Sequence, residues 1–256
     1  MMLDEPYRFA EAVSNRRDYI EDQLRGGSPV VGLTYADGIL FLTLGRGQQK
    51  IYETYDRIAM GSVGHPTDIE KLRQAAVDLA SVVGFNYSDA DVTLQQIVHF
   101  GLGPAVKASF DDIIRSPYIS RILLAELDGD NGSVFYTVDY DGSFATQEAV
   151  AVVGGSSDAD AAMLATAEFA TDRASLNDAL QMALKVWAVG WHISQQDEVS
   201  ETSSTVAEDD VRSTLSSALE DLAVEAVILD RTRNTKSKYL ALSADVTQPA
   251  VDAITG

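Results

Sequence analysis

The chain has 256 residues, 46% of them hydrophobic, which is enough for a globular core that needs no disulfide or metal to fold. It carries 19 basic and 39 acidic residues, a net charge of −20, which argues against binding to nucleic acid or to anionic membranes. The absence of cysteine excludes disulfides and thiolate zinc sites, and the three histidines lack the spacing of a metal site. No apolar run is long enough to span a membrane and no secretory signal is present, so we expect a cytoplasmic protein without cofactor or metal.

The first half of the chain predicts one helix, four strands and then two long helices. A thin apolar stripe at spacings of three and four residues predicts the first helix over residues 9–24, ending at Arg25-Gly26-Gly27. Asp37-Gly38 between two apolar runs is typical of a hairpin, and the second run is apolar on both faces. The predicted strands cover residues 29–35, 39–44, 49–52 and 57–63. The long helices begin near Thr67, as a capping residue, and near Ser88, and two glycines and a proline predict a kink in the second.

The second half predicts three strands, two helices and a final mixed segment. The strands cover residues 120–127, 133–140 and 149–153, and the helices residues 158–169 and 175–191. Trp187 and Trp191 are expected to anchor the core. The acidic stretch 195–210 has no periodicity and predicts a mobile insertion. A short helix to residue 222, strands over 223–229 and 238–242, and a frayed tail after Pro249 complete the prediction. The order of elements predicts an α+β, four-layer αββα sandwich in a single domain.

Ser28 stands at the head of the first predicted strand, directly after Gly26-Gly27, and here the chain resembles a known family. The similarity extends over about residues 7–242. It is carried by the helix that ends in Arg25-Gly26-Gly27, residues 30–41 (VVGLTYADGILF), Gln49-Lys50-Ile51, Tyr55-Asp56-Arg57, Gly64 before a long helix, and Val153-Gly154-Gly155-Ser156 at a strand-to-helix turn. In order and spacing these stretches resemble the proteasome superfamily, and most of all its bacterial 20S α-type subunits. The resemblance implies the N-terminal-nucleophile (Ntn) hydrolase fold, which is a four-layer αββα sandwich.

Catalytic and non-catalytic members of this family differ in chemistry. A catalytic β subunit exposes an N-terminal threonine by self-cleavage after a glycine, with a lysine that lowers the local pKa and an acid that orients the lysine. By resemblance Ser28 matches the threonine and Lys50 the lysine, but the second strand ends without an acid. Pro29 also constrains the turn that self-cleavage needs. We therefore expect no catalytic residue. The alternative is a self-processing amidohydrolase or peptidase that uses Ser28 and Lys50.

The resemblance also assigns roles to the segments around the strands. Residues 1–26 would form a gate segment and a helix on the face of a ring, and residues 27–256 the sandwich domain. The gate would consist of Met1, Met2, Leu3, Asp4, Glu5 and Pro6. In the family, the C-terminal tails of ATPase rings insert between neighbouring α subunits, where a lysine in the turn before the first long helix meets the tail carboxylate. His65 takes the place of that lysine here. A neutral imidazole offers one hydrogen bond instead of a full charge, so docking would use His65 with residues such as Lys71, unless His65 is an ordinary turn residue.

The expected function is that of a non-catalytic α-type subunit in protein degradation. By resemblance it would form a homo-heptameric ring that caps rings of catalytic β subunits, gates the entry of unfolded proteins and docks an ATPase activator. The helix over residues 92–115 would face the β ring. Besides the Ser28 hydrolase, a proteasome-like scaffold that neither cuts nor joins a β ring stays open.

Overall fold

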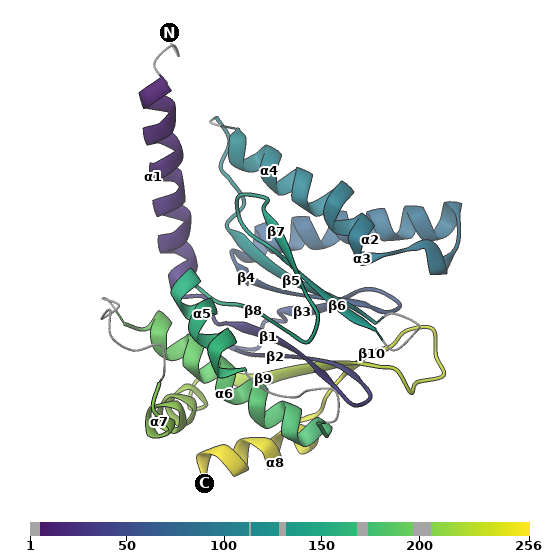
Figure 1. Ribbon diagram of the computed structural model, residues 1–256, viewed down its shortest axis with the longest axis vertical. Helices are drawn as coiled ribbons and strands as arrows, with labels where there is room; N and C mark the ends of the chain where they lie inside the picture. Colours follow the sequence, from purple (N-terminus) through teal and green to yellow (C-terminus); the bar gives the residue numbers. More distant parts are fainter. Residues whose placement is uncertain (1–5, 113, 128–131, 168–173, 197–205) are drawn as a thin grey trace.

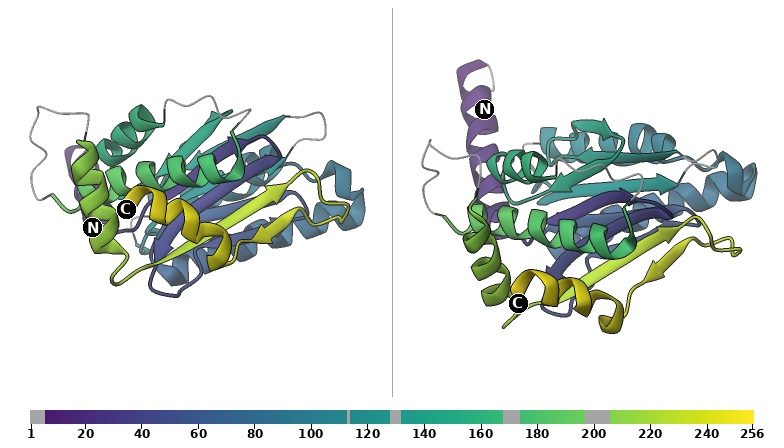
Figure 2. Two further views of the ribbon diagram at one scale, coloured as in Figure 1. Left: turned by 90° about the horizontal axis from the view of Figure 1, so that it is seen from below. Right: turned by 60° about the horizontal axis from the view of Figure 1, so that its bottom comes forward.

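The computed structural model of the protein describes residues 6–112, 114–127, 132–167, 174–196 and 206–256. Two antiparallel sheets lie face to face, and helices cover the outer face of each (Figure 1). The turned views show the same succession of helix, sheet, sheet and helix (Figure 2). The four-layer αββα sandwich predicted from the sequence is confirmed.

Each sheet of the described chain has five strands. The strands of the first sheet are β1 (Val30–Tyr35), β2 (Gly38–Gly45), β8 (Val150–Val153), β9 (Ala223–Asp230) and β10 (Tyr239–Ala241). Those of the second are β3 (Ile51–Tyr55), β4 (Ile58–Gly64), β5 (Ser120–Leu127), β6 (Ser133–Val138) and β7 (Phe144–Gln147). Their spatial orders are β10-β9-β2-β1-β8 and β3-β4-β5-β6-β7. The predicted hairpin joins β1 to β2, with Tyr35 paired to Gly38.

The helices divide between the two outer faces. They are α1 (Pro6–Arg25), α2 (Pro66–Asn86), α3 (Leu94–Gln96), α4 (Gly103–Asp111), α5 (Ser157–Thr166), α6 (Leu176–Ser194), α7 (Glu208–Ala218) and α8 (Ala244–Thr255). α2 to α4 lie on the second sheet and α5 to α8 on the first, whereas α1 projects away from the sandwich (Figure 1). Among the described helices, none has the length and apolar character needed to cross a membrane.

Three apolar layers hold the stack together, and β2 shows how the sequence builds two of them. Leu40, Leu42 and Leu44 pack toward the helices α5 to α8, while Ile39 and Phe41 pack between the two sheets. Because side chains alternate along a strand, a strand covered on both sides must be apolar at every position. The third layer lies between the second sheet and α2 to α4.

The tryptophans of α6 lie at the layer that α6 forms with the first sheet. Trp187 is fully buried, as predicted for a core anchor. Trp191 stacks on it with a distance of 5.4 Å between ring centroids, yet it is partly exposed and lines a pocket. The core role is therefore confirmed for Trp187, whereas Trp191 serves the core only in part.

The start of α2 differs from the sequence prediction. His65 is the N-cap, since its Nδ1 accepts a hydrogen bond of 3.3 Å from the backbone N–H of Thr67. Pro66 takes the first helical position, where its missing N–H costs nothing. Thr67 was predicted as the cap and instead lies inside the first turn. The pattern misleads because Thr67 and Glu70 have capping-box spacing, while the proline fixes the cap and the helix start two residues earlier.

The second long helix also begins later than predicted. Asp89–Asp91 form a separate 3₁₀ turn, and α3 begins after Thr93, whose hydroxyl accepts from the N–H of Gln96 at 3.3 Å. The predicted kink is present as a π-helical segment, Ile97–Leu102, between α3 and α4.

Two elements near the surface are missed by the sequence pattern. β7 is a short edge strand with mostly exposed side chains, so it has no apolar alternation to reveal it. The frayed tail predicted after Pro249 is wrong: Ala250, Val251 and Ile254 of α8 are buried in the outer core layer. The predicted insertion 195–210 falls largely outside the described residues, which resume at residue 206, and its last three residues begin α7.

Candidate functional site

A pocket of about 320 Å³ opens at the end of the sandwich where β1 begins. Its walls come from the link between α1 and β1, the end of β2, the start of β3, the turn before α2 and the end of α6. Ser28 and Lys50, the two candidate residues of the hydrolase alternative, both line it. Arg46 and Trp191 also line it, as do Gly64 and Pro66, which flank His65.

The hydroxyl of Ser28 is engaged in structural hydrogen bonds. It donates to the carbonyl of Leu44 at 2.6 Å and accepts from Nε1 of Trp187 at 3.1 Å. A nucleophile needs its proton directed toward a base, whereas this proton is directed at a backbone carbonyl. Ser28 therefore ties the start of β1 to β2 and α6.

Lys50 approaches Ser28 on the backbone side. Its ammonium donates to the carbonyl of Ser28 at 2.5 Å and to Oγ1 of Thr43 at 3.1 Å. Thr43 in turn donates to the carbonyl of Pro29 at 2.7 Å. Burial lowers the pKa of Lys50 to about 7, against the opposing effect of the Glu225 carboxylate. Lys50 therefore lies beside Ser28, but it contacts the backbone carbonyl of Ser28 and not the hydroxyl, which is the group that would have to lose a proton.

Glu225 is the acidic residue that the sequence pattern did not single out. It lies on β9 opposite Thr43 of β2, and its carboxylate accepts from the backbone N–H groups of Lys50 and Ile51 at 2.9–3.1 Å. Burial raises its pKa, while these hydrogen bonds and Lys50 act in the other direction. A carboxylate bonded to the main chain of β3 orients the strand, and none of the bonds described for it reaches the Lys50 ammonium. In the described part of the chain, no group of three or more His, Asp or Glu has the arrangement of a metal site.

His65 and Lys71 lie on the first turns of α2, beside the pocket. His65 is exposed and caps the helix, and its neighbours Gly64 and Pro66 line the pocket. Lys71 is exposed, forms an ion pair of 3.4 Å with Asp68 and lies 5.9 Å above the ring of Tyr118. The structure therefore places His65 between two residues that line the pocket, whereas Lys71 contacts Asp68 of its own helix and the ring of Tyr118.

The predicted gate segment lies mostly outside the described residues. Met1, Met2, Leu3, Asp4 and Glu5 are not described, and Pro6 is the first residue of α1. The predicted helix over residues 9–24 is confirmed as the main part of α1.

Comparisons with known proteins identify the family to which this fold belongs. A family profile described as proteasome subunit matches residues 24–208. The chain is 33% identical over 240 residues to the proteasome subunit alpha of a Nocardioides species, a match that covers 91% of this chain and 82% of that protein. It is 32% identical to the same subunit of Acidothermus cellulolyticus, over 69% of this chain and 75% of that protein, and 29% identical to that of Mycolicibacterium smegmatis, over 68% and 72%. The chain belongs to the proteasome subunit family, and the relatives it matches are bacterial α subunits.

Proposed function

We propose that the chain is a non-catalytic α subunit of a bacterial proteasome in the cytoplasm. It assembles into a seven-membered ring that caps rings of catalytic β subunits, gates the entry of unfolded proteins and docks an ATPase ring. The observation that carries this proposal is the bonding of Ser28: its hydroxyl donates to the Leu44 carbonyl, and Lys50 contacts the Ser28 carbonyl instead of the hydroxyl. Ser28 stands where catalytic subunits of the family have their nucleophile, but here its hydroxyl holds the start of β1 against β2 and α6.

The exposed apolar side chains of the α2–α4 layer support a contact with a partner ring. Phe85 at the end of α2 is 91% exposed and Phe100 in the π-helical segment is 77% exposed, with Tyr87 nearby in sequence at 77%. Large aromatic side chains left in water are typical of protein interfaces. This agrees with the expectation that the helix over residues 92–115 faces the β ring.

The pocket beside His65 supports docking of a partner's tail. It is lined by Arg46 and by Lys50, whose pKa of about 7 allows a bound carboxylate to favour its charged form. We propose that the tail carboxylate enters this pocket and that His65 contacts the tail at the rim. Lys71 contributes less, because it is already paired with Asp68.

Native and denaturing mass spectrometry of the purified chain tests the assembly and separates it from the hydrolase alternative. We expect a species of about 193 kDa, seven times the 27.6 kDa of one chain, or its double, with residues 1–27 still attached. Loss of residues 1–27, which would expose Ser28 as an N-terminal residue, would overturn the proposal in favour of a self-processing hydrolase. If the chain is monomeric, the same measurement is made after co-expression with the β subunit, and a monomer there too would favour the scaffold alternative.

Docking is tested with the C-terminal decapeptide of the ATPase ring subunit from the same organism, labelled for fluorescence polarisation. We expect the free-acid peptide to bind at least about tenfold more tightly than its C-terminal amide, because only the carboxylate forms a charge-assisted bond. Binding should weaken between pH 6 and pH 8, since Lys50 loses its charge near pH 7. His65→Ala should weaken binding about threefold to tenfold.

Lys71→Met and Lys107→Met make a matched pair of controls for that experiment. Both remove an exposed lysine paired with an aspartate on its own helix, and Lys107 lies on α4, away from the residues that line the pocket. We expect both to bind within about twofold of the unmodified chain. Equal affinity for acid and amide peptides would contradict the assignment of the pocket.

A further inference from the structure

α1 leaves the body of the protein and is held to it by few apolar contacts. Of its side chains from residue 10 onward, Ile20 and Leu24 are buried, and both lie in the last two turns. The helix projects beyond the sheets and runs past the end of α4 (Figure 1). Farther out, Val13 packs partly buried against the layer that contains Phe110, and polar contacts along the side of α1 add to this packing.

Arg16 makes the most extensive of these contacts. Its guanidinium donates to the backbone carbonyls at the end of α4 and in the segment after it, namely those of Ser109 (3.3 Å), Phe110 (2.8 Å), Asp112 (2.8 Å) and Arg115 (3.1 Å). The last carbonyls of a helix have no partner within the helix and carry its negative dipole end. Arg16 thus supplies, from another helix, the cationic cap that α4 lacks in its own sequence, since the last turn of α4 contains no basic residue.

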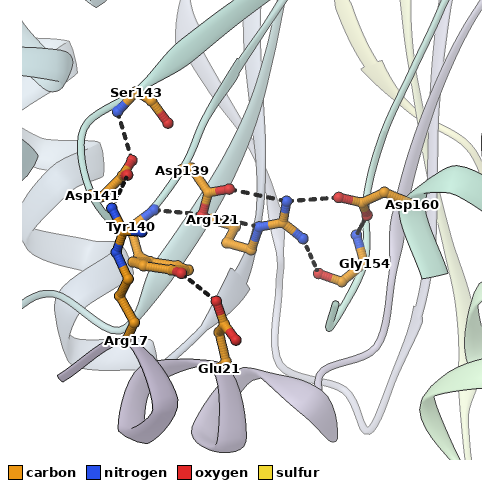
Figure 3. Close-up of polar contacts among 9 residues, drawn as sticks. All are labelled: Arg17, Glu21, Arg121, Asp139, Tyr140, Asp141, Ser143, Gly154 and Asp160. Carbon is orange, nitrogen blue, oxygen red and sulfur yellow. Dashed lines mark hydrogen bonds and ion pairs between the residues drawn. The ribbon is translucent and has the colours of Figure 1, made fainter. Parts of the chain in front are cut away.

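A second set of contacts joins α1 to the turn after β6 (Figure 3). The hydroxyl of Tyr140 donates to the carboxylate of Glu21 at 2.5 Å, and Arg17 lies 3.6 Å from the carboxylate of Asp141. Burial and the bond to Glu21 raise the pKa of Tyr140, so the hydroxyl keeps its proton as a donor. This turn is close to α4 as well, because a Cβ at Gly142 would lie 2.6 Å from the backbone nitrogen of Lys107.

The turn itself is fixed by Arg121 on β5. Arg121 bonds the Asp139 carboxylate at 3.2 Å, the carbonyl of Gly154 at 3.0 Å and the Asp160 carboxylate at 2.6 Å (Figure 3). Asp160 closes the chain of contacts by accepting from the N–H of Gly154 at 2.5 Å. The β6–β7 turn is therefore fixed from within the sandwich by Arg121, and the end of α4 is the second support of α1.

We propose that Arg16 is a positioning residue that couples α4 to α1. It holds the direction of α1 against the C-terminal end of α4, so that a displacement of α4 by a partner is transmitted to α1. The coupling rests on the proposed function in one respect, that a β subunit contacts the α2–α4 layer. By reciprocity, a partner that moves α1 changes the affinity of the helix layer by the same factor.

Arg17 offers a matched comparison on the same helix. It is next in sequence and carries the same charge, but its side chain is 51% exposed and its ion pair with Asp141 is 3.6 Å long. Its contact with α4 is with the ring of Phe110, 5.9 Å from the guanidinium, and not with the backbone carbonyls. An exposed pair of this kind contributes little, while a guanidinium shared among four carbonyls is replaced poorly by any other side chain. Arg16→Lys keeps the positive charge but loses the planar guanidinium, which can donate several hydrogen bonds at once.

Hydrogen–deuterium exchange of the full chain without a partner tests the positioning role. Arg16→Gln should speed amide exchange in residues 12–24 by about tenfold or more, while Arg17→Gln changes it by less than about threefold. Arg16→Lys should lie between the two. Exchange in β1, β2 and β5 should be unchanged in all three variants, which shows that the sandwich remains folded. Equal effects of the two glutamine variants would overturn the inference.

The coupling is then measured by adding the purified β subunit from the same organism. In the unmodified chain, binding should slow exchange both in α4 and in α1. In Arg16→Gln, α4 should still be protected while the protection of α1 falls at least threefold, an effect that a merely structural role does not produce. Protection of both helices in Arg16→Gln would overturn the coupling. If the β subunit does not protect α4 in the unmodified chain, the proposed function is contradicted instead. The exchange measured without the β subunit would still decide whether Arg16 positions α1.

Discussion

Replacing Arg121 by methionine is expected to lower the free energy of unfolding by about 3–5 kcal/mol at pH 7, the usual cost of removing one member of a buried ion pair. The Arg121 side chain is 13% exposed and holds two carboxylates, those of Asp139 and Asp160. Burial raises the pKa of Asp160 even with Arg121 in place, so its charge is already unfavourable. Methionine would fill the volume but leave that charge without its partner. Urea unfolding followed by tryptophan fluorescence measures the loss.

The pH dependence of the Arg121→Met variant gives an independent check. Without the arginine, Asp160 takes up a proton more readily in the folded than in the unfolded state, so the variant gains stability as pH falls. The deficit should therefore be smaller at pH 5 than at pH 7. Arg115→Met is the control, because its side chain is 84% exposed and its pair with Asp112 spans 3.5 Å. It should change the free energy of unfolding by less than about 0.5 kcal/mol, and a similar small effect for Arg121→Met would contradict its role as a support.

Much of the sandwich could be predicted because local patterns decide it. β2 is apolar on both faces, and Asp37-Gly38 forces a tight connection, so its place between two layers follows from the residues themselves. β7 could not be predicted, because an exposed edge strand needs no apolar alternation and is held by pairing with β6 alone. α8 was misjudged since Pro249 is typical of a helix end, while burial of Ile254 outweighs that preference.

In the candidate site, too, some residues could be predicted from the sequence and others could not. Ser28 could be singled out from its position at the head of a strand, and Lys50 from the resemblance to proteasome subunits. The structure brings the two residues together. Glu225 and Trp187 could not, because each lies far away in sequence and reaches the site only through the β2–β9 pairing or the packing of α6. The bonding of the Ser28 hydroxyl depends on these two distant elements. The sequence could therefore locate the site, while its chemical character required the fold.

Replacing Lys50 by methionine is expected to change how stability depends on pH. The pKa of Lys50 is 10.5 in the unfolded chain and about 7 in the folded protein, chiefly because burial disfavours the charge. Between these values the unfolded state binds more protons, so the stability of the unmodified protein rises with pH. Between pH 6.5 and pH 9.5, the free energy of unfolding of the unmodified protein should rise by about 3 kcal/mol more than that of Lys50→Met. Urea unfolding at a series of pH values measures the difference between the two proteins.

The difference in free energy of unfolding between the two proteins cancels the effect of groups that titrate equally in both. Lys107→Met is the control: it removes an exposed lysine, so its difference from the unmodified protein should not change with pH over the same range. A flat difference for Lys50→Met would mean that Lys50 keeps its ordinary pKa and is always charged. The outcome bears on function, because a lysine that titrates near pH 7 is charged only part of the time when the pocket is empty. A carboxylate that enters the pocket then draws a proton onto Lys50, so docking takes up protons and weakens as pH rises through 7.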